Sequence, residues 1–110
     1  MFCKIARHEI ASQIVYEDDQ VVAFRDVNPV APVHILVIPK KHVPAVTALD
    51  DKDKELIGHI VLVIKKLAQE TSVVEDGFRV VVNAGKHAGQ RVPHLHFHLL
   101  GGKAMGWPPG

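Results

Sequence analysis

The sequence predicts a small α+β domain built on an antiparallel sheet. Its 110 residues suit a single domain, and no internal repeat or linker divides them. Short runs of β-branched and aromatic residues lie on both sides of one long helical pattern, so strands precede and follow a single main helix. Apolar residues make up 47% of the chain, which is enough for a modest core.

The first part of the chain is expected to form a short helix followed by three strands. Residues 1–11 mix apolar and charged types in a way that favours a short helix. The extended run at 14–16 and the β-branched, aromatic run at 21–25 are typical of a hairpin. Residues 34–38 follow as another strand, which ends at Pro39 because proline has no amide hydrogen for the ladder.

Residues 50–70 carry the clearest helical pattern. Asp50 can cap the helix, and Asp51 and Asp53 lie in the first turn, where the positive end of the helix dipole favours acids. Apolar residues recur at three- and four-residue spacing and form one broad stripe. The members of this stripe are Leu56, Ile57, Ile60, Val61, Leu62, Val63, Ile64, Leu67 and Ala68. Either the core of the domain covers all of this surface, or a second subunit covers part of it.

The last third of the chain is expected to form two strands and a tail. The strands span 78–83 and 92–100, and a glycine-containing loop at 84–90 lies between them. The tail, 103–110, contains Trp107. Burial of an indole ring is strongly favourable, so we expect the tail to dock.

Charge and cysteine content exclude several classes of protein. Thirteen Lys and Arg against twelve Asp and Glu give a net charge of +1, whereas binders of nucleic acid or anionic membranes usually carry a basic excess. The single cysteine, Cys3, excludes an internal disulfide framework. No apolar run approaches the ~20 residues of a membrane span, and the charged first residues are unlike a secretory signal. We therefore expect a cytoplasmic protein without a nucleic-acid or membrane partner.

Three of the eight histidines alternate with apolar residues in the segment His94-Leu95-His96-Phe97-His98-Leu99-Leu100. Successive side chains of a strand point to opposite faces, so His94, His96 and His98 share one face, about 6.5–7 Å apart at Cα for each two-residue step. The apolar residues between them can pack against the helix. Asn83 ends the preceding strand and can point to the same face as the histidines. The pattern predicts a titratable patch on a rigid sheet.

Two chemistries suit such a patch, zinc ligation and metal-free nucleophilic catalysis. Each protonated ring disfavours protonation of the next, so at least one ring tends to stay neutral near pH 7. A neutral ring is needed both for attack on an electrophile and for metal ligation, so charge leaves both interpretations open. The histidine face of this strand has no Asp or Glu, and Cys3 is the only thiol, so further metal ligands are scarce.

The segment 94–100 resembles the signature of the histidine triad superfamily, in which three alternating histidines are each followed by an apolar residue. The segments 31–42, 82–85 and 89–90 and the Trp-Pro-Pro-Gly ending at 107–110 are similar to the histidine triad nucleotide-binding branch. Members of that branch hydrolyse nucleoside phosphoramidates.

The resemblance implies an architecture. It has a five-stranded antiparallel sheet with one main helix and a short N-terminal helix. Two subunits would pair through the helix and the strand 78–83, so that the sheet continues across a homodimer. The tail 103–110 of this single domain, 1–110, would then dock near the active site or the dimer interface.

The resemblance also implies a mechanism and a set of site residues. His96 would attack the α-phosphorus of a purine nucleoside 5′-phosphoramidate, an adenosine phosphoramidate or an aminoacyl-adenylate-like molecule, and form a covalent nucleotidyl-histidine. Water would then release AMP or GMP. His34 and His94 would orient His96 through a hydrogen-bonded relay, and His98 would contact the phosphate or the leaving group. The remaining nucleotide-binding residues implied are Asp26 for the ribose, Phe24, Val27, Ile5 and Ile10 for the base, Asn83, Gly89, Gln90 and Arg91 for the phosphate, and Phe97.

Other functions stay open at this point. The implied enzyme uses no cofactor and no metal, and its partners are purine nucleoside monophosphates and phosphoramidates. A dinucleoside polyphosphate hydrolase is an alternative, which the Trp-Pro-Pro-Gly ending disfavours. A nucleotide-binding regulatory or scaffold protein with incidental hydrolysis is another, which the complete triad disfavours. A histidine-ligated metalloprotein is the third.

Overall fold

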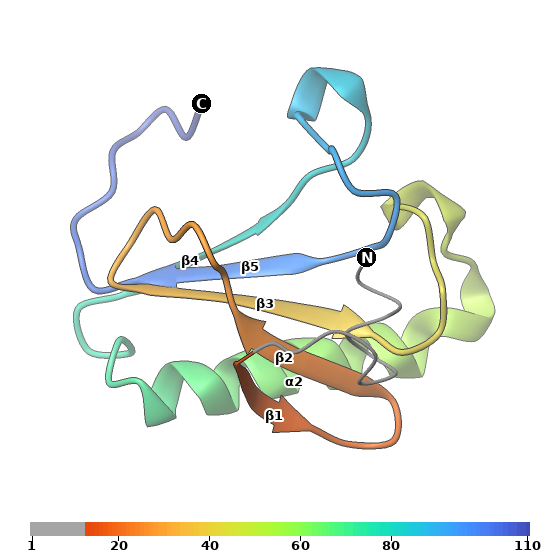
Figure 1. Cartoon of the computed structure of the whole chain (residues 1–110), viewed down its shortest axis with the longest axis horizontal. Coiled ribbons are helices and arrows are strands. Elements are labelled where there is room, and N and C mark those ends of the chain that lie inside the picture. Colours follow the sequence, from red (N-terminus) through yellow and green to blue (C-terminus); the bar gives the residue numbers. More distant parts are fainter. Residues whose placement is uncertain (1–12) are drawn as a thin grey trace.

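A computed structural model describes residues 13–110, which form one five-stranded antiparallel sheet flanked by one long helix (Figure 1). The strands lie in the order β1-β2-β3-β5-β4, so β1 and β4 are the edges. The elements are β1 (Ile14–Glu17), β2 (Val21–Arg25), β3 (Val33–Pro39), the 3₁₀ helices η1 (Val46–Ala48) and η2 (Asp51–Asp53), α2 (Lys54–Glu70), β4 (Phe78–Val82), η3 (Lys86–Ala88) and β5 (Phe97–Gly101). The predicted α+β class and antiparallel sheet are confirmed. The short helix predicted for residues 1–11 lies outside the described residues.

The sheet separates two apolar clusters. The helix α2 covers one face, and the β2–β3 loop, the loop that carries η3 and the C-terminal tail lie on the other (Figure 1). Residues packed on the helix side include Ile35, Val37 and Leu99, which alternate with residues of the opposite face. The smaller cluster on that opposite face consists of Val22, Phe24, Leu36 and Ile38. Side chains of the sheet therefore alternate between a large core under α2 and the opposite face, on which a functional site can lie.

The helix begins as the acidic first turn predicts. The Asp50 carboxylate accepts a hydrogen bond from the Lys52 amide at 2.9 Å, and the Asp50 amide donates to Asp53 Oδ2 at 3.0 Å, which together make a capping box. Asp53 is buried and also accepts from Lys41 Nζ at 2.8 Å. The first turn of the predicted helix is 3₁₀, and the α-helical part starts at Lys54.

Some residues of the broad apolar stripe of α2 are buried in the core of the domain, and others are exposed. The residues buried in the core of the domain are Ile60, Val63, Ile64, Leu67 and Ala68. Val61 and Leu62 point outward and are 53% and 63% exposed. The helix has 17 residues, which is too short and too rich in charge for a bilayer crossing, and no other helix among the described residues has the required length and apolarity.

The last strand is shorter than the predicted span 92–100. Pro93 has no amide hydrogen, the His94 amide donates back to the Val92 carbonyl at 2.8 Å, and the Leu95 amide donates to the Val43 carbonyl at 2.6 Å. These bonds hold the segment before Phe97 away from the ladder. Of the three alternating histidines, only His98 lies within the strand β5, and the expectation that one strand carries all three is wrong.

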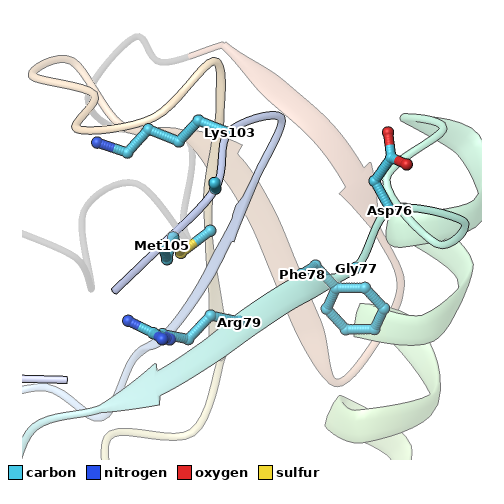
Figure 2. A pocket seen from close by; sticks show the side chains of 7 residues that line it. Asp76, Gly77, Phe78, Arg79, Lys103 and Met105 are labelled. Carbon is cyan, nitrogen blue, oxygen red and sulfur yellow. The ribbon is translucent and has the colours of Figure 1, made fainter. Parts of the chain in front are cut away.

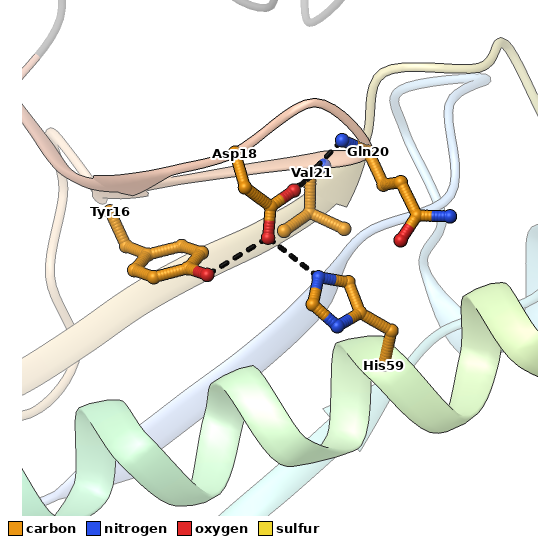
Figure 3. A network of polar contacts seen from close by, with 5 residues as sticks. All are labelled: Tyr16, Asp18, Gln20, Val21 and His59. Atoms are coloured by element: carbon orange, nitrogen blue, oxygen red, sulfur yellow. Dashed lines mark hydrogen bonds and ion pairs between the residues drawn. The ribbon is translucent and has the colours of Figure 1, made fainter.

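Asp18 ties the β1–β2 hairpin to α2 on the helix side of the sheet (Figure 3). Its Oδ1 accepts from the amides of Gln20 and Val21 at 2.8 and 2.9 Å. Its Oδ2 accepts from the Tyr16 hydroxyl at 2.8 Å and lies 2.6 Å from Nε2 of His59, which belongs to α2. Burial opposes ionisation of the carboxyl, but the hydrogen bonds outweigh burial and lower the pKa of Asp18 below its ordinary value.

The substitution Asp18→Asn should destabilise the protein at neutral pH. A carboxyl with a lowered pKa in the folded state stabilises that state above its ordinary pKa, and the stabilisation is lost as the pH falls through the folded-state value. We expect the free energy of unfolding to drop by about 1.5–3 kcal/mol at pH 7, as for other hydrogen bonds to charged groups, and by less at pH 3. Urea unfolding at both pH values measures this. Asp19→Asn, at the exposed neighbouring position, is the control, and an equal loss at both pH values would contradict the assignment.

Ser72 lies two residues beyond the end of α2, and its backbone is in the left-handed region, with φ at 62°. The Val73 amide donates to the Ala68 carbonyl at 3.1 Å across this turn, so the backbone conformation closes the last turn of the helix. A residue with a Cβ atom is strained there, whereas glycine is not.

The substitution Ser72→Gly should stabilise the protein by about 0.5–1 kcal/mol, because glycine relieves the strain and its extra freedom in the unfolded chain offsets only part of the gain. Ser72→Ala keeps the Cβ and serves as the control. Chemical denaturation measures both variants, and a glycine variant no more stable than the alanine variant would show that the strain is absent.

Candidate active site

Three histidines, His34 and the nearby pair His96 and His98, meet on the face of the sheet opposite α2. The β3–β5 register pairs His34 with Leu100 and Leu36 with His98, so His34 and His98 point to the same side. The ring centroids of His34 and His98 are 5.2 Å apart, and those of His96 and His98 are 5.0 Å apart. The cluster therefore consists of one ring from β3, one from β5 and one from the segment that precedes β5.

The orientation of His96 is set by the backbone of its own segment. His96 Nδ1 lies 2.7 Å from the carbonyl oxygen of His94, and a carbonyl can only accept. Nδ1 therefore carries the hydrogen, and the lone pair of the neutral ring lies on Nε2. The ring is 9% exposed, so its position is also fixed by packing. An imidazole held in this tautomer is suited to nucleophilic attack through Nε2.

The ring of His94 occupies a different place from the other two rings of the segment. It is 2% exposed, its Nε2 lies 3.0 Å from the Pro39 carbonyl, and its ring packs edge-on against His42 at a centroid distance of 5.1 Å. His94 thus contacts His96 through its backbone carbonyl. The predicted relay from His34 and His94 to His96 differs from this arrangement, because His34 bonds to His98 and the His94 ring bonds to β3.

His34 and His98 form a direct pair. His34 Nε2 lies 2.9 Å from His98 Nδ1, and His34 Nδ1 accepts from the Val30 amide at 3.1 Å. Asp26 approaches the pair, with its Oδ2 3.4 Å from His34 Nε2. The nitrogen His98 Nε2 is buried and has no hydrogen-bond partner among residues 13–110.

The electrostatics of the cluster favour neutral rings. Burial, and then the neighbouring rings of His96 and His34, lower the pKa of His98 to about 4, against the opposing effect of Asp26. Burial also lowers the pKa of His34, again opposed by Asp26, and lowers the pKa of His94. Near pH 7 these rings therefore carry no charge, which keeps their lone pairs available for hydrogen bonding.

Two rings of the cluster, together with Asp26, are a candidate metal centre by composition. Asp26, His34 and His98 each offer one ligating atom, and these atoms lie within 4.8 Å of one another. Two imidazoles and a carboxylate are a donor set that zinc accepts.

The residues predicted for the ribose and the base are only partly brought together. Asp26 lies beside His34, and its Oδ1 accepts from the Asn28 amide at 2.8 Å. Phe24 is 3% exposed within the smaller cluster on the histidine face, whereas Val27 is 85% exposed. The two predicted isoleucines, Ile5 and Ile10, lie outside the described residues.

The loop predicted to hold the phosphate uses part of its backbone internally. The Gly89 amide donates to the Lys86 carbonyl at 3.0 Å, and the Gln90 amide donates to the Gly85 carbonyl at 3.1 Å. A phosphate bound by these two amides, as expected from the resemblance, would therefore compete with hydrogen bonds that the amides already make within the loop. Arg91 follows the loop and is exposed, and Asn83 precedes it and is partly buried.

The side chains of two predicted nucleotide-binding residues, Gln90 and Phe97, make contacts within the protein itself. The Gln90 side chain clamps the loop, because its Nε2 donates to the Pro44 carbonyl at 2.7 Å and its Oε1 accepts from the Gly85 amide at 3.0 Å. The Phe97 ring belongs to the core on the helix side, so it points away from the histidines. Only the backbone of Phe97 can face a ligand.

Sequence reasoning missed the backbone groups that orient the rings. The Val30 amide, the Pro39 carbonyl and the His94 carbonyl each bond a histidine nitrogen. Every residue has such groups, so their type gives no signal in the sequence, and only the folded chain places them. The contact of His42 with His94 was also missed, because the two residues are 52 positions apart.

A separate hollow lies at the outer edge of the sheet beside β4 (Figure 2). Its volume is about 350 Å³, and it is lined by Asp76, Gly77, Phe78, Arg79, Lys103, Ala104 and Met105. Arg79 Nη2 also donates to the Gly106 carbonyl at 2.8 Å and so ties the start of the tail to β4. None of the lining residues is a histidine, so this hollow is distinct from the cluster.

Comparisons with known proteins agree with the geometry. The family model of the HIT domain matches residues 7–105. The chain is 51% identical over its full length to an uncharacterized HIT-like protein of Synechocystis, covering 96% of that protein. It is 45% identical to the purine nucleoside phosphoramidase of Escherichia coli, over 96% of this chain and 89% of that protein.

Solved structures show the same fold. The crystal structure of a HIT family hydrolase from Legionella pneumophila matches with a TM-score of 0.99 at 49% identity and covers all of this chain and 98% of that one. A histidine triad protein from Clostridium difficile matches with a TM-score of 0.92 at 52% identity, over 96% and 91% of the two chains. The chain belongs to the HIT domain family, and the resemblance to the histidine triad superfamily is confirmed.

Proposed function

We propose that this HIT family hydrolase cleaves the phosphorus–nitrogen bond of purine nucleoside 5′-phosphoramidates, including adenosine phosphoramidates and aminoacyl-adenylate-like molecules. The observation that carries the proposal is the 2.7 Å contact between His96 Nδ1 and the His94 carbonyl, which leaves the lone pair of the neutral ring on Nε2. The 45% identity to the phosphoramidase of Escherichia coli supports the choice of substrate.

The reaction proceeds in two displacements. His96 Nε2 forms a bond to the α-phosphorus while the phosphorus–nitrogen bond breaks, and the leaving nitrogen takes up a proton to depart as an amine. The product is a nucleotidyl-histidine whose Nδ1–H stays on the His94 carbonyl. Water then attacks phosphorus, loses a proton and releases AMP or GMP. Division into two steps replaces one difficult displacement by two easier ones.

The proposed nucleotide-binding residues each have a chemical role. Asp26 has a carboxylate that can accept both hydroxyls of a ribose. Phe24 and Val27, with Ile5 and Ile10, would hold the base. Asn83 and the Arg91 amide would hold phosphate oxygens together with His98. No cofactor or metal has a role in the proposed steps.

The proposed enzyme is a homodimer that joins through the helix side of the edge strand β4. Phe78 and Val80 point to that side, because Val80 pairs with the core residue Leu99, and they are 39% and 43% exposed. Val61 and Leu62 of α2 are exposed apolar residues as well. A second copy would cover these side chains and pair with the open edge of β4.

The tail 103–110, whose Trp107 is exposed, would dock near the active site or this interface.

Replacement of His96 by Ala tests the mechanism. Intact mass spectrometry after rapid mixing with an adenosine phosphoramidate should show one adenylyl group on the wild-type protein, and peptide mapping should place it on His96. The His96→Ala variant should show no adduct and lose several powers of ten in turnover, because it lacks the nucleophile. His59→Gln, on the opposite face of the sheet, is the control with retained activity. An active His96→Ala enzyme, or an adduct on another residue, would refute the proposal.

A double substitution, Leu62→Glu with Val80→Glu, tests the dimer. Buried interfacial charges without partners are costly, so the variant should sediment as a monomer where the wild type sediments as a dimer. Analytical ultracentrifugation at several protein concentrations measures this. The exposed substitution Lys65→Glu is the control. A monomeric wild type, or a variant dimer of unchanged affinity, would refute this interface.

A further inference from the structure

A further hollow lies on the face of the sheet opposite α2, between the β2–β3 loop and the first residues of the C-terminal tail. Its volume is about 280 Å³. The side chains that give it apolar walls and the two cations that line it are Val30, Ala31, Leu100 and Met105, with Arg79 and Lys103. We call it the loop–tail hollow. Its lining therefore combines apolar surface with positive charge.

The strand register places the loop–tail hollow beside the histidine cluster. Leu100 pairs with His34 on β3 and with Arg79 on β4, so these three side chains form one row on the same face of the sheet. Neighbouring strands are about 4.8 Å apart, which puts the backbone of Arg79 about 10 Å from that of His34. The amide of Val30, another lining residue, donates to His34 Nδ1 at 3.1 Å. The hollow and the cluster therefore adjoin.

The tail side of the loop–tail hollow is fixed by the fold. Gly102 turns the chain back over the sheet with a φ of 88°, a conformation that favours glycine. A Cβ atom at Gly102 would lie 2.9 Å from Cβ of Pro32, so this turn packs directly on the β2–β3 loop. Further along the tail, the Gly106 carbonyl accepts from Arg79 Nη2 at 2.8 Å. These contacts hold both sides of the hollow in place, so it is preformed.

The loop–tail hollow is positively charged. No Asp or Glu lines it. All twelve acidic residues of the chain lie at or before Asp76, whereas four Lys and Arg residues lie beyond it. Figure 2 shows the charged ends of Lys103 and Arg79 extending to the same side, with Met105 between them, while Asp76 points the other way. Among residues 13–110, neither Arg79 nor Lys103 forms an ion pair with a carboxylate. The two cations are therefore available to an anionic ligand.

The lining suits a small ligand that has an apolar part and a carboxylate. One nitrogen of the Arg79 guanidinium donates to Gly106, but arginine has five N–H donors, so others remain. Arginine can bind both oxygens of a carboxylate, and lysine adds three further donors. Pockets for drug-sized ligands measure about 300–1,000 Å³, so the loop–tail hollow fits a smaller fragment, such as an amino acid.

We propose that the loop–tail hollow binds the amine portion of the substrate, and that Arg79 and Lys103 select amines that carry a carboxylate. The preferred substrates are then nucleoside 5′-phosphoramidates of amino acids, in which the amino nitrogen is bonded to phosphorus and the carboxylate lies in the hollow. The role of this fragment as a leaving group rests on the proposed function. In that function the nucleoside lies at Asp26, on the β2 side of His34, and the hollow lies on the β4 side, where it is available to the amine.

The binding of two matched adenosine phosphonates tests the proposal without turnover. In both ligands a methylene group replaces the scissile nitrogen. The chain beyond it ends in a carboxylate in one ligand and in a carboxamide in the other. We expect the wild type to bind the carboxylate about 10-fold more tightly in isothermal titration calorimetry, and the preference to shrink between about 0.05 and about 0.5 M NaCl. Equal affinities for the two ligands at low salt would overturn the proposal.

Substitutions of the two cations test whether the preference comes from the loop–tail hollow. Lys103→Gln should reduce the preference for the carboxylate to about 3-fold, and its combination with Arg79→Gln should abolish it, with the affinity for the carboxamide unchanged within about 2-fold. Because Arg79 also holds Gly106, Arg79→Lys is a second variant that keeps the charge and should retain most of the preference. Lys65→Gln, at an exposed position of α2, is the matched control. An unchanged preference in the double variant, or equal losses for both ligands, would overturn the proposal.

Turnover separates this proposal from the proposed function. The substrates are the adenosine phosphoramidates of an amino acid and of the matched amino acid amide. The two amines differ in basicity, so selectivity is the change in the ratio of their kcat/KM values between the wild type and the double variant. We expect this ratio to be about 10-fold higher in the wild type, mainly through KM. An unchanged ratio, with both compounds hydrolysed, would overturn the selectivity and leave the phosphoramidase. If neither compound is hydrolysed but the binding preference holds, the phosphoramidase is refuted and the carboxylate-selective hollow stands.

Discussion

The antiparallel register between β3 and β5 is the constraint on which the site depends. It sets Leu36 opposite His98 and His34 opposite Leu100, so both histidines face away from α2. The intervening residues Ile35 and Leu99 enter the core under the helix. A slip of one residue would exchange the two sets and bury imidazoles against α2. Hydrophobic burial on one face thereby fixes catalytic geometry on the other.

The fold also lowers the pKa values of His34, His94 and His98, mainly by burial, so that these rings stay neutral near pH 7. Rings that are packed together in a partly dry site disfavour one another's protonation, and backbone carbonyls and amides satisfy the remaining nitrogens. His96 and His94 each bond a carbonyl, whereas His34 bonds an amide. Because the Val30 amide donates to His34 Nδ1, the tautomer of His34 is the opposite of that of His96. Neighbouring rings of one residue type can therefore carry lone pairs and hydrogens at different positions.

Much of the architecture could be predicted because it depends on side-chain type. The period-two and period-three-to-four patterns identify the strands and the helix, and Asp50 identifies the helix start. The histidine alternation identifies two of the three rings of the cluster, His96 and His98. The start of β5 could not be predicted, because it depends on the bond from the Leu95 amide to the Val43 carbonyl, which joins residues far apart in sequence. The partner of His34 escaped prediction for the same reason, since the strand register selects His98.

The loop between β2 and β3 contains both Asp26, which is proposed to bind the ribose, and Val30, whose amide bonds to His34. Asp26 opens this loop and turns it by accepting the Asn28 amide, and Val30 further along donates to His34. A ligand hydroxyl bound to the Asp26 carboxylate would compete with its 3.4 Å approach to His34 Nε2 and leave that N–H wholly to His98. Ribose binding would then strengthen the hydrogen bond between His34 and His98. In the proposed enzyme, a short turn set by Asp26 and the Val30 amide would thus couple occupancy of the nucleoside site to the order of the histidine cluster.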